Sequence, residues 1–171
     1  MKIYKKLQQN DIDTLRKAIE ENCHDAKKIL ELLDKSKFPH CYKTGIFPPD
    51  FSDILINSST ESRDLDQSEL PNIREVIESI RNEPSFLCQT NANRRLDGKM
   101  VRQYQDEFIL TGNKPSCFFL VDRDYYPDMN PKGLFYVRDG MHHLVAYGLA
   151  VNMKEDGFPI LGYYSTKKER V

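Results

Sequence analysis

Apolar residues near the start of the chain recur at spacings that predict helices. One apolar stripe with a helical period begins after Asn10, and a second runs from Ala26 to about Lys35. Asn10 is a residue type favoured at the N-cap, and Asp11 and Asp13 stand where the helix dipole favours negative charge. The two stripes predict a helical hairpin, or one bent helix, that packs against a sheet.

Two more helices are predicted in the middle of the chain. The first begins between Ser68 and Pro71, because proline is tolerated in the first turn and branched apolar residues follow at helical spacing. The second runs from about Arg94 to Leu110. Gly112 stands just beyond it, in the position where glycine ends many helices.

Short apolar runs bounded by turn residues predict the strands. These runs are Asp53–Asn57, Ser116–Val121, Leu134–Val137 and Pro159–Tyr164. The prolines within residues 37–51 exclude a continuous helix there, so this stretch is predicted to be a loop held to the body by its aromatic side chains. Residues 58–68 and 152–157 are polar without a period and are predicted to be exposed connections.

The order of these elements predicts an α+β fold, a small mixed sheet with flanking helices. With 171 residues the chain is long enough for one compact domain with a substantial core. We expect residues 1–50 to form an N-terminal helical extension that packs on a core formed by residues 51–171. Together the two parts are expected to make one compact unit.

Composition narrows the functional classes. The chain is 39% apolar and 30% charged, and its longest apolar runs are too short to cross a bilayer, so no membrane partner is expected. Because the first residues lack the apolar segment of a secretion signal, we expect a cytoplasmic protein. A formal net charge of -1 argues against holding nucleic acid by bulk charge, although local basic patches leave nucleic acid open as a partner.

Residues Leu134–Ala150 combine a strand, a tight turn and a helix with reactive side chains. The turn is Arg138-Asp139-Gly140, and the helix begins with Met141-His142-His143. Backbone N–H groups in the first turn of a helix have no internal partner, and the helix dipole adds positive charge there. The sequence therefore predicts an anion site at this turn, most naturally for a phosphate.

Each residue of the turn has an expected role. Arg138 is suited to a forked contact with phosphate oxygens, and His142 and His143 are suited to donate hydrogen bonds to them. Gly140 lets an anion approach the backbone, whereas Asp139 is suited to accept a sugar hydroxyl, act as a base or hold a metal ion. The alternative is an ordinary tight turn in which Asp139 caps the helix. No metal site is predicted from the two histidines alone, because adjacent helical positions point to different faces.

A basic face is predicted on the helix that starts near Arg94. Arg95, Lys99 and Arg102 lie on its exposed side. They are candidates for an auxiliary basic face that extends the anion site or touches nucleic acid. The alternative is a solvated helix surface without a specific ligand.

The turn and its surroundings resemble the ParB/sulfiredoxin superfamily. The resemblance rests on Asp139-Gly140-Met141-His142-His143-Leu144, which is similar to that family's Asp-Gly-x-His-Arg-Leu motif between a strand and an Ala-rich helix. The order of elements is similar over about residues 53–164, including an Ile-x-x-Ser-Ile-like pattern at Val76–Ile80. The resemblance implies a ParB/sulfiredoxin-like fold and a phosphate or a nucleotide as the ligand of this loop, with Mg²⁺ as the candidate cofactor of the nucleotide.

Carried over by position, the resemblance assigns the site to Asp139, Gly140 and His142. His143 occupies the place of the family's usual arginine. Sulfiredoxin chemistry uses a cysteine where this chain has Met141, so sulfinate reduction is disfavoured. The family's DNA-segregation proteins carry a helix-turn-helix module after the core, and the short remainder of this chain disfavours that role as well.

Three functions remain open after the sequence has been considered. The first is a phosphate- or nucleotide-binding domain of ParB/sulfiredoxin type, and the second is a non-catalytic module with a degenerate pocket that contacts protein or nucleic acid. The third is a ParB-like nuclease or nucleotide hydrolase, with His142 and Asp139 as the catalytic pair. The retained Asp139 and His142 favour an enzyme, whereas the missing arginine at position 143 favours binding. The oligomeric state stays open.

Overall fold

A single sheet organises the fold. The computed structural model describes residues 1–23, 26–56, 71–90, 96–112, 118–122, 134–151 and 159–170. Within these residues a six-stranded sheet has the order β1-β2-β6-β4-β5-β3. The strands are β1 (Lys2–Lys6), β2 (His40–Ile46), β3 (Ile54–Ile56), β4 (Phe119–Asp122), β5 (Phe135–Asp139) and β6 (Ile160–Thr166). The pairs β4–β6 and β3–β5 are parallel and the others antiparallel, so the sheet is mixed and the predicted α+β class is confirmed.

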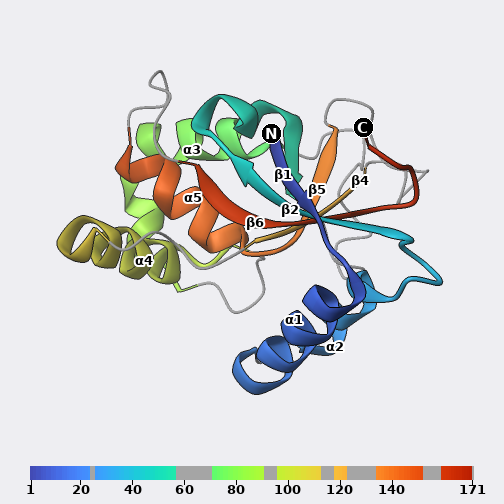
Figure 1. Cartoon of the computed structure of the whole chain (residues 1–171). Coiled ribbons are helices and arrows are strands. Elements are labelled where there is room, and N and C mark those ends of the chain that lie inside the picture. The colour runs from blue at the N-terminus through green and yellow to red at the C-terminus, as the bar shows by residue number, and fades with distance from the viewer. Residues whose placement is uncertain are drawn as a thin grey trace, which may run out of the picture.

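Helices lie on both sides of the sheet (Figure 1). The α-helices are α1 (Gln9–Asn22), α2 (Ala26–Leu30), α3 (Ile73–Asn82), α4 (Gly98–Thr111) and α5 (Met141–Ala150). Short 3₁₀ turns are η1 (Glu31–Leu33), η2 (Pro48–Asp53) and η4 (Pro84–Cys88). In Figure 1, α1 and α2 lie below the sheet, and α3 and α5 lie on its other side. No helix among the described residues is long and apolar enough to cross a membrane.

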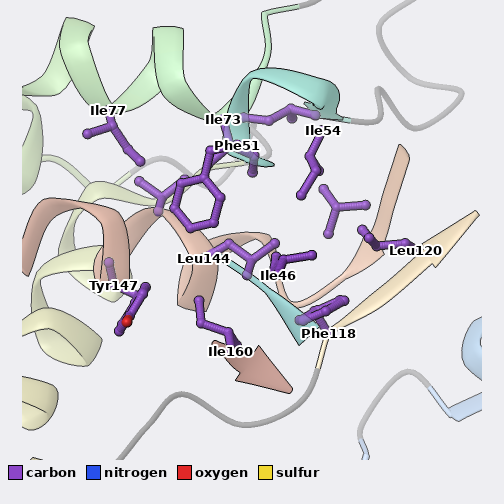
Figure 2. Close-up of a cluster of buried hydrophobic side chains, with 14 of the residues drawn as sticks. Ile46, Phe51, Ile54, Ile73, Ile77, Phe118, Leu120, Leu144, Tyr147 and Ile160 are labelled. Atoms are coloured by element: carbon purple, nitrogen blue, oxygen red, sulfur yellow. The ribbon is translucent and has the colours of Figure 1, made fainter. Parts of the chain in front are cut away.

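Alternation along the strands builds a separate core on each face. Leu120 of β4 packs toward α3 and α5, whereas its neighbours Phe119 and Val121 pack toward α1 and α2. Figure 2 shows the larger core, where Phe51, Ile77 and Leu144 converge from η2, α3 and α5 above the strand residues. The sheet is therefore buried on both faces in its centre.

A close helix contact fixes the position of α5. Gly148 lies where α5 meets α3, and a Cβ atom added to it would stand 2.1 Å from Cδ1 of Ile77. Arg81 of α3 also donates to the carbonyl oxygen of Gly148, at 3.0 Å. These contacts hold α5 against α3, and thereby fix the place of its N-terminus at the end of β5.

The structure corrects the prediction for residues 1–50. This segment contributes two strands as well as helices, because β1 pairs with β2 and β2 pairs with β6. The stretch predicted as a loop over residues 37–51 holds β2 and the start of η2. The two N-terminal stripes form separate helices that pack on the sheet. The cap of α1 is Gln8 rather than Asn10, and the backbone N–H of Gln8 donates to Oδ2 of Asp11 at 2.9 Å.

Most other predicted elements are confirmed with shifted ends. The strand predicted at residues 53–57 is β3, and the strand before the focal turn is β5. The third helix starts after its cap Asn72, whose side chain accepts from the amide of Glu75 at 2.9 Å. Gly112 ends α4 in the left-handed conformation, with φ 65°. The predicted connections at residues 58–68 and 152–157 lie outside the described residues.

Candidate functional site

The β5–α5 turn has the backbone geometry of a sharp strand-to-helix junction. β5 ends at Asp139, and α5 begins at Met141. Between them Gly140 occupies the N-cap position with φ 89° and ψ 10°, a left-handed conformation that side chains with a Cβ atom rarely adopt. The N-cap is thus glycine rather than Asp139, and it supplies no side-chain cap to the first turn of α5. Amides of that first turn are the groups for which a helix provides no acceptor of its own.

His142 is held by the start of α4. The backbone N–H of Asp97 donates to Nε2 of His142 at 3.0 Å. Since Nε2 accepts this bond, it carries no proton, and the neutral ring has its proton on Nδ1. Burial lowers the pKa of His142, with His143 acting in the same direction and the carboxylates of Asp97 and Asp139 opposing. His142 is therefore a neutral imidazole at neutral pH.

His143 packs against a second residue of α4. Its ring stacks on the ring of Tyr104, with centroids 3.8 Å apart and planes 28° apart. Burial lowers the pKa of His143 too, and the nearby carboxylates of Asp139 and Glu107 oppose that shift. Both histidines of the motif are thus fixed by α4, one through a hydrogen bond and one through ring stacking.

The strand side of the turn faces the other helical layer. Tyr136 packs in the core beneath α1 and α2. The half-buried Arg138 stands at an irregularity of the β4–β5 register, between Val137, which pairs with Leu120, and Asp139. Asp139 is exposed and is paired in the sheet with Phe119, which also belongs to that core. Burial raises the pKa of the Cys23 thiol, and the negative charge of Asp139 raises it further. The carboxylate of Asp139 therefore lies near Cys23, at the end of α1.

The turn therefore stands between the end of α1 and the start of α4. Asp139 lies near the end of α1, whereas His142 and His143 lie against α4. Met141 is half-buried and packs against the larger core. The structure brings the predicted turn residues together at one strand end.

The predicted auxiliary basic face is not part of this arrangement. Lys99 and Arg102 are exposed and lie on the side of α4 opposite Tyr104, the residue that contacts His143. Arg102 lies 3.8 Å from Asp106, its neighbour one turn along the helix. Together with Glu107 and Leu110 they line a shallow surface hollow that also carries carboxylates. Arg95 lies outside the described residues.

Sequence reasoning missed the residues of α4 that shape the site. The stacking of Tyr104 with His143 depends on how α4 crosses α5. The amide of Asp97 carries no side-chain signal at all, and it meets His142 across 45 residues of sequence. Asp97 also caps α4, since its side chain accepts from the amide of Met100 at 3.0 Å. The aspartate in this capping position is the sequence feature that indicates where α4 begins.

The turn carries polar side chains with carboxylates close to its two histidines. Among the described residues, no group of three His, Cys, Asp or Glu side chains is arranged to hold a metal ion. The nearby carboxylates are those of Asp139, Asp97 and Glu107. Comparison with known proteins finds no match to a family model, to a curated protein or to a solved structure.

Proposed function

We propose that the chain binds a phosphate-containing small molecule, with a nucleotide as the preferred class, at the β5–α5 turn. One observation carries the proposal: Gly140, with φ 89°, joins the end of β5 directly to the first turn of α5. A glycine in this conformation brings the backbone close to a ligand, and the helix dipole favours an anion at that point. The similarity of the Asp139–His143 motif to the ParB/sulfiredoxin superfamily supports the same ligand class.

The state of His142 favours binding over acid–base chemistry. Its Nε2 atom is already the acceptor for the Asp97 amide, and burial lowers its pKa. A ring held in this way donates one hydrogen bond from Nδ1 and does not exchange a proton through Nε2. We therefore assign His142 a neutral donor and positioning role. A hydrolase or nuclease that acts through Asp139 is the second candidate, supported by the exposure of that carboxylate beside the turn.

The carboxylates beside the turn indicate how a nucleotide would bind. Three carboxylates near the histidines, those of Asp139, Asp97 and Glu107, oppose a bare anion by charge repulsion. Magnesium is commonly held by one or two carboxylates together with substrate phosphates. Asp139 is exposed at the turn and fits such a ligand role, so we propose that the nucleotide binds as its Mg²⁺ complex.

A thermal-shift series with nucleotides and pyrophosphate tests this function. A ligand at about a hundred times its Kd stabilises the native state by ~2.7 kcal/mol, or about 5–10 °C for a domain of this size. Met141→Glu places a negative charge at the start of α5 and should abolish the shift. Gln103→Glu adds the same charge on the exposed side of α4 and should leave it intact. No shift with any phosphate compound, or equal loss in both variants, would contradict the proposal.

Asp139→Asn tests the role of magnesium and separates binding from catalysis. If Asp139 holds the metal ion, the variant should lose the Mg²⁺-dependent part of nucleotide affinity and bind the metal-free nucleotide more tightly. Incubation of the wild-type protein with nucleotides and DNA then distinguishes the candidates. Turnover that Asp139→Asn abolishes identifies an enzyme, and binding without turnover identifies a binding module.

A further inference from the structure

A buried carboxylate lies at the other end of the sheet from the β5–α5 turn. Asp122 ends β4, and the residue is only 9% exposed. Its Oδ1 accepts a hydrogen bond from the hydroxyl of Tyr164, and its Oδ2 accepts one from the hydroxyl of Thr166. Both donors are fully buried and come from β6, the parallel neighbour of β4. The carboxylate is therefore fixed in position and withdrawn from water.

A buried carboxylate needs a cation beside it, because an unpaired charge inside a protein is strongly unfavourable. Within the described residues, Arg170 is the cation at ion-pair distance. Its Nη2 atom lies 3.1 Å from Oδ1 of Asp122, and its Nε donates to the hydroxyl oxygen of Tyr164 at 3.3 Å. The Arg170 side chain is 47% exposed, against 12% for that of Asp122. The guanidinium thus closes the pocket from the solvent side.

Aromatic rings pack around the Tyr164 side chain that holds the carboxylate. Tyr42 stacks on Tyr164 with centroids 6.2 Å apart, and Phe135 meets Tyr164 edge-on at 5.3 Å. The hydroxyl of Tyr42 accepts from the backbone amide of Arg170 at 2.9 Å. A fixed carboxylate beside a hydroxyl acceptor suits the planar fork of a guanidinium, which contacts the two groups from two nitrogens. We call the set of Asp122, Tyr164, Thr166 and Tyr42 the Asp122 pocket.

The residue that fills the pocket comes from the segment after β6. Residues 167–170 belong to no helix or strand. The Lys6–Glu169 ion pair of this segment is exposed, and exposed ion pairs contribute little to stability. Hydrogen bonds also join Lys168 to Thr166. Arg170 is the residue of this segment whose side chain reaches the buried Asp122.

We propose that the Asp122 pocket is a guanidinium-binding site that the chain occupies with its own Arg170, and that an arginine side chain from a partner peptide takes the pocket when residues 167–170 are displaced. While Arg170 occupies the pocket, an external arginine cannot enter it. An external arginine competes with the internal one, and binding releases the 167–170 segment. The chemistry favours arginine over lysine, since Nη2 and Nε of a planar guanidinium contact Asp122 and the Tyr164 hydroxyl from two nitrogens, whereas an ammonium ion offers one.

Titration of the full chain with N-acetyl-arginine amide, followed by NMR, tests this site. Arg170→Ala should give saturable shifts at the amides of Asp122, Tyr164 and Thr166, and N-acetyl-lysine amide should give none. Wild-type protein should bind about tenfold more weakly if Arg170 fills the pocket about 90% of the time. The double variant Asp122→Asn/Arg170→Ala should lose binding by a similar factor. Free arginine added in parallel shows whether the ligand must be peptide-like.

Three results would overturn the proposal. They are equal responses to the arginine and lysine compounds, equal binding by the Arg170→Ala protein with and without Asp122→Asn, and equal binding by wild type and Arg170→Ala. A measurement on wild type alone guards against a variant that fails to fold. At high concentrations of N-acetyl-arginine amide, the Arg170 amide should lose its bond to Tyr42 and move toward a solvent-exposed shift. An unmoved Arg170 amide would also contradict competition for the pocket.

Discussion

Two replacements of His142 distinguish the effect of its hydrogen bond from the effect of its titration. His142→Ala removes the acceptor of the Asp97 amide, a bond of 3.0 Å in partly buried surroundings. His142→Gln keeps a carbonyl acceptor at a similar reach and removes the titrating ring. The two variants therefore differ mainly in whether the N–H of Asp97, at the start of α4, retains a partner.

The structure sets the size of the effect. A buried amide left without an acceptor costs about 1–3 kcal/mol. We expect His142→Ala to lower the free energy of unfolding by at least that amount, which corresponds to a fall in Tm of roughly 2–10 °C for a domain of this size. For His142→Gln we expect a loss below about 1 kcal/mol, because the bond is replaced rather than removed.

The pH dependence gives an independent check. Burial lowers the pKa of His142 below that of a free histidine side chain, so the unfolded chain binds a proton at a higher pH than the folded one. The stabilisation is therefore fully present above the unfolded pKa and is lost as pH falls through the folded pKa. His142→Gln should lose less stability than wild type on acidification. His143→Gln is the matched control. In this variant the part of the pH dependence of the unfolding free energy that comes from His142 should remain.

Urea unfolding followed by circular dichroism at about pH 7.5 and about pH 5 measures these differences. NMR titration of the His142 ring gives its pKa directly. A pKa at or above 6.5, or equal stability losses for the Ala and Gln variants, would refute the account of His142 as a neutral acceptor. The same result would remove the reason for preferring binding over acid–base chemistry at the turn.

Three further substitutions test the elements that position the turn. Gly140→Ala should cost about 1–2 kcal/mol in thermal unfolding because φ is 89°, and an equal melting temperature would show that the turn relaxes. Gly148→Ala should cost about 1–3 kcal/mol by driving a methyl group into Ile77, and unchanged stability would show that α3 and α5 separate easily. Asn72→Ala should cost about 1 kcal/mol in urea unfolding, because it removes the capping box with Glu75; no loss would contradict that cap.

The local structure of the turn was predictable because its signals are local. A run of β-forming residues, the Asp139-Gly140 pair and apolar helical spacing specify strand, turn and helix without reference to the rest of the chain. Gly140 indeed adopts the left-handed conformation that only glycine adopts freely. The same reasoning located α3, α4 and β6 to within a few residues.

Elements that depend on distant partners were not predictable in this way. Every residue of β1 is exposed, so Lys2–Lys6 shows no apolar alternation, and only its pairing with β2 makes it a strand. The strand β2 holds Lys43 and Gly45 between β1 and β6. Its extended conformation is decided by pairing on both sides rather than by propensity.

The missed features of the site have the same origin. The bond from the Asp97 amide to His142 joins positions 45 residues apart, and a backbone donor leaves no trace in the sequence. The direction of Lys99 and Arg102 was in principle accessible, since Tyr104 lies on the opposite side of the same helix. The sequence does not indicate that the side of α4 that carries Tyr104 faces α5.

The most direct test of phosphate binding at the turn is a ¹⁵N NMR titration with pyrophosphate and with a nucleotide, each with and without Mg²⁺. We predict saturable shifts centred on the amides of Gly140, Met141 and His142, lost in Met141→Glu and retained in Gln103→Glu. The absence of shifts at these amides, or shifts confined to Lys99 and Arg102 on the outer side of α4, would contradict the account.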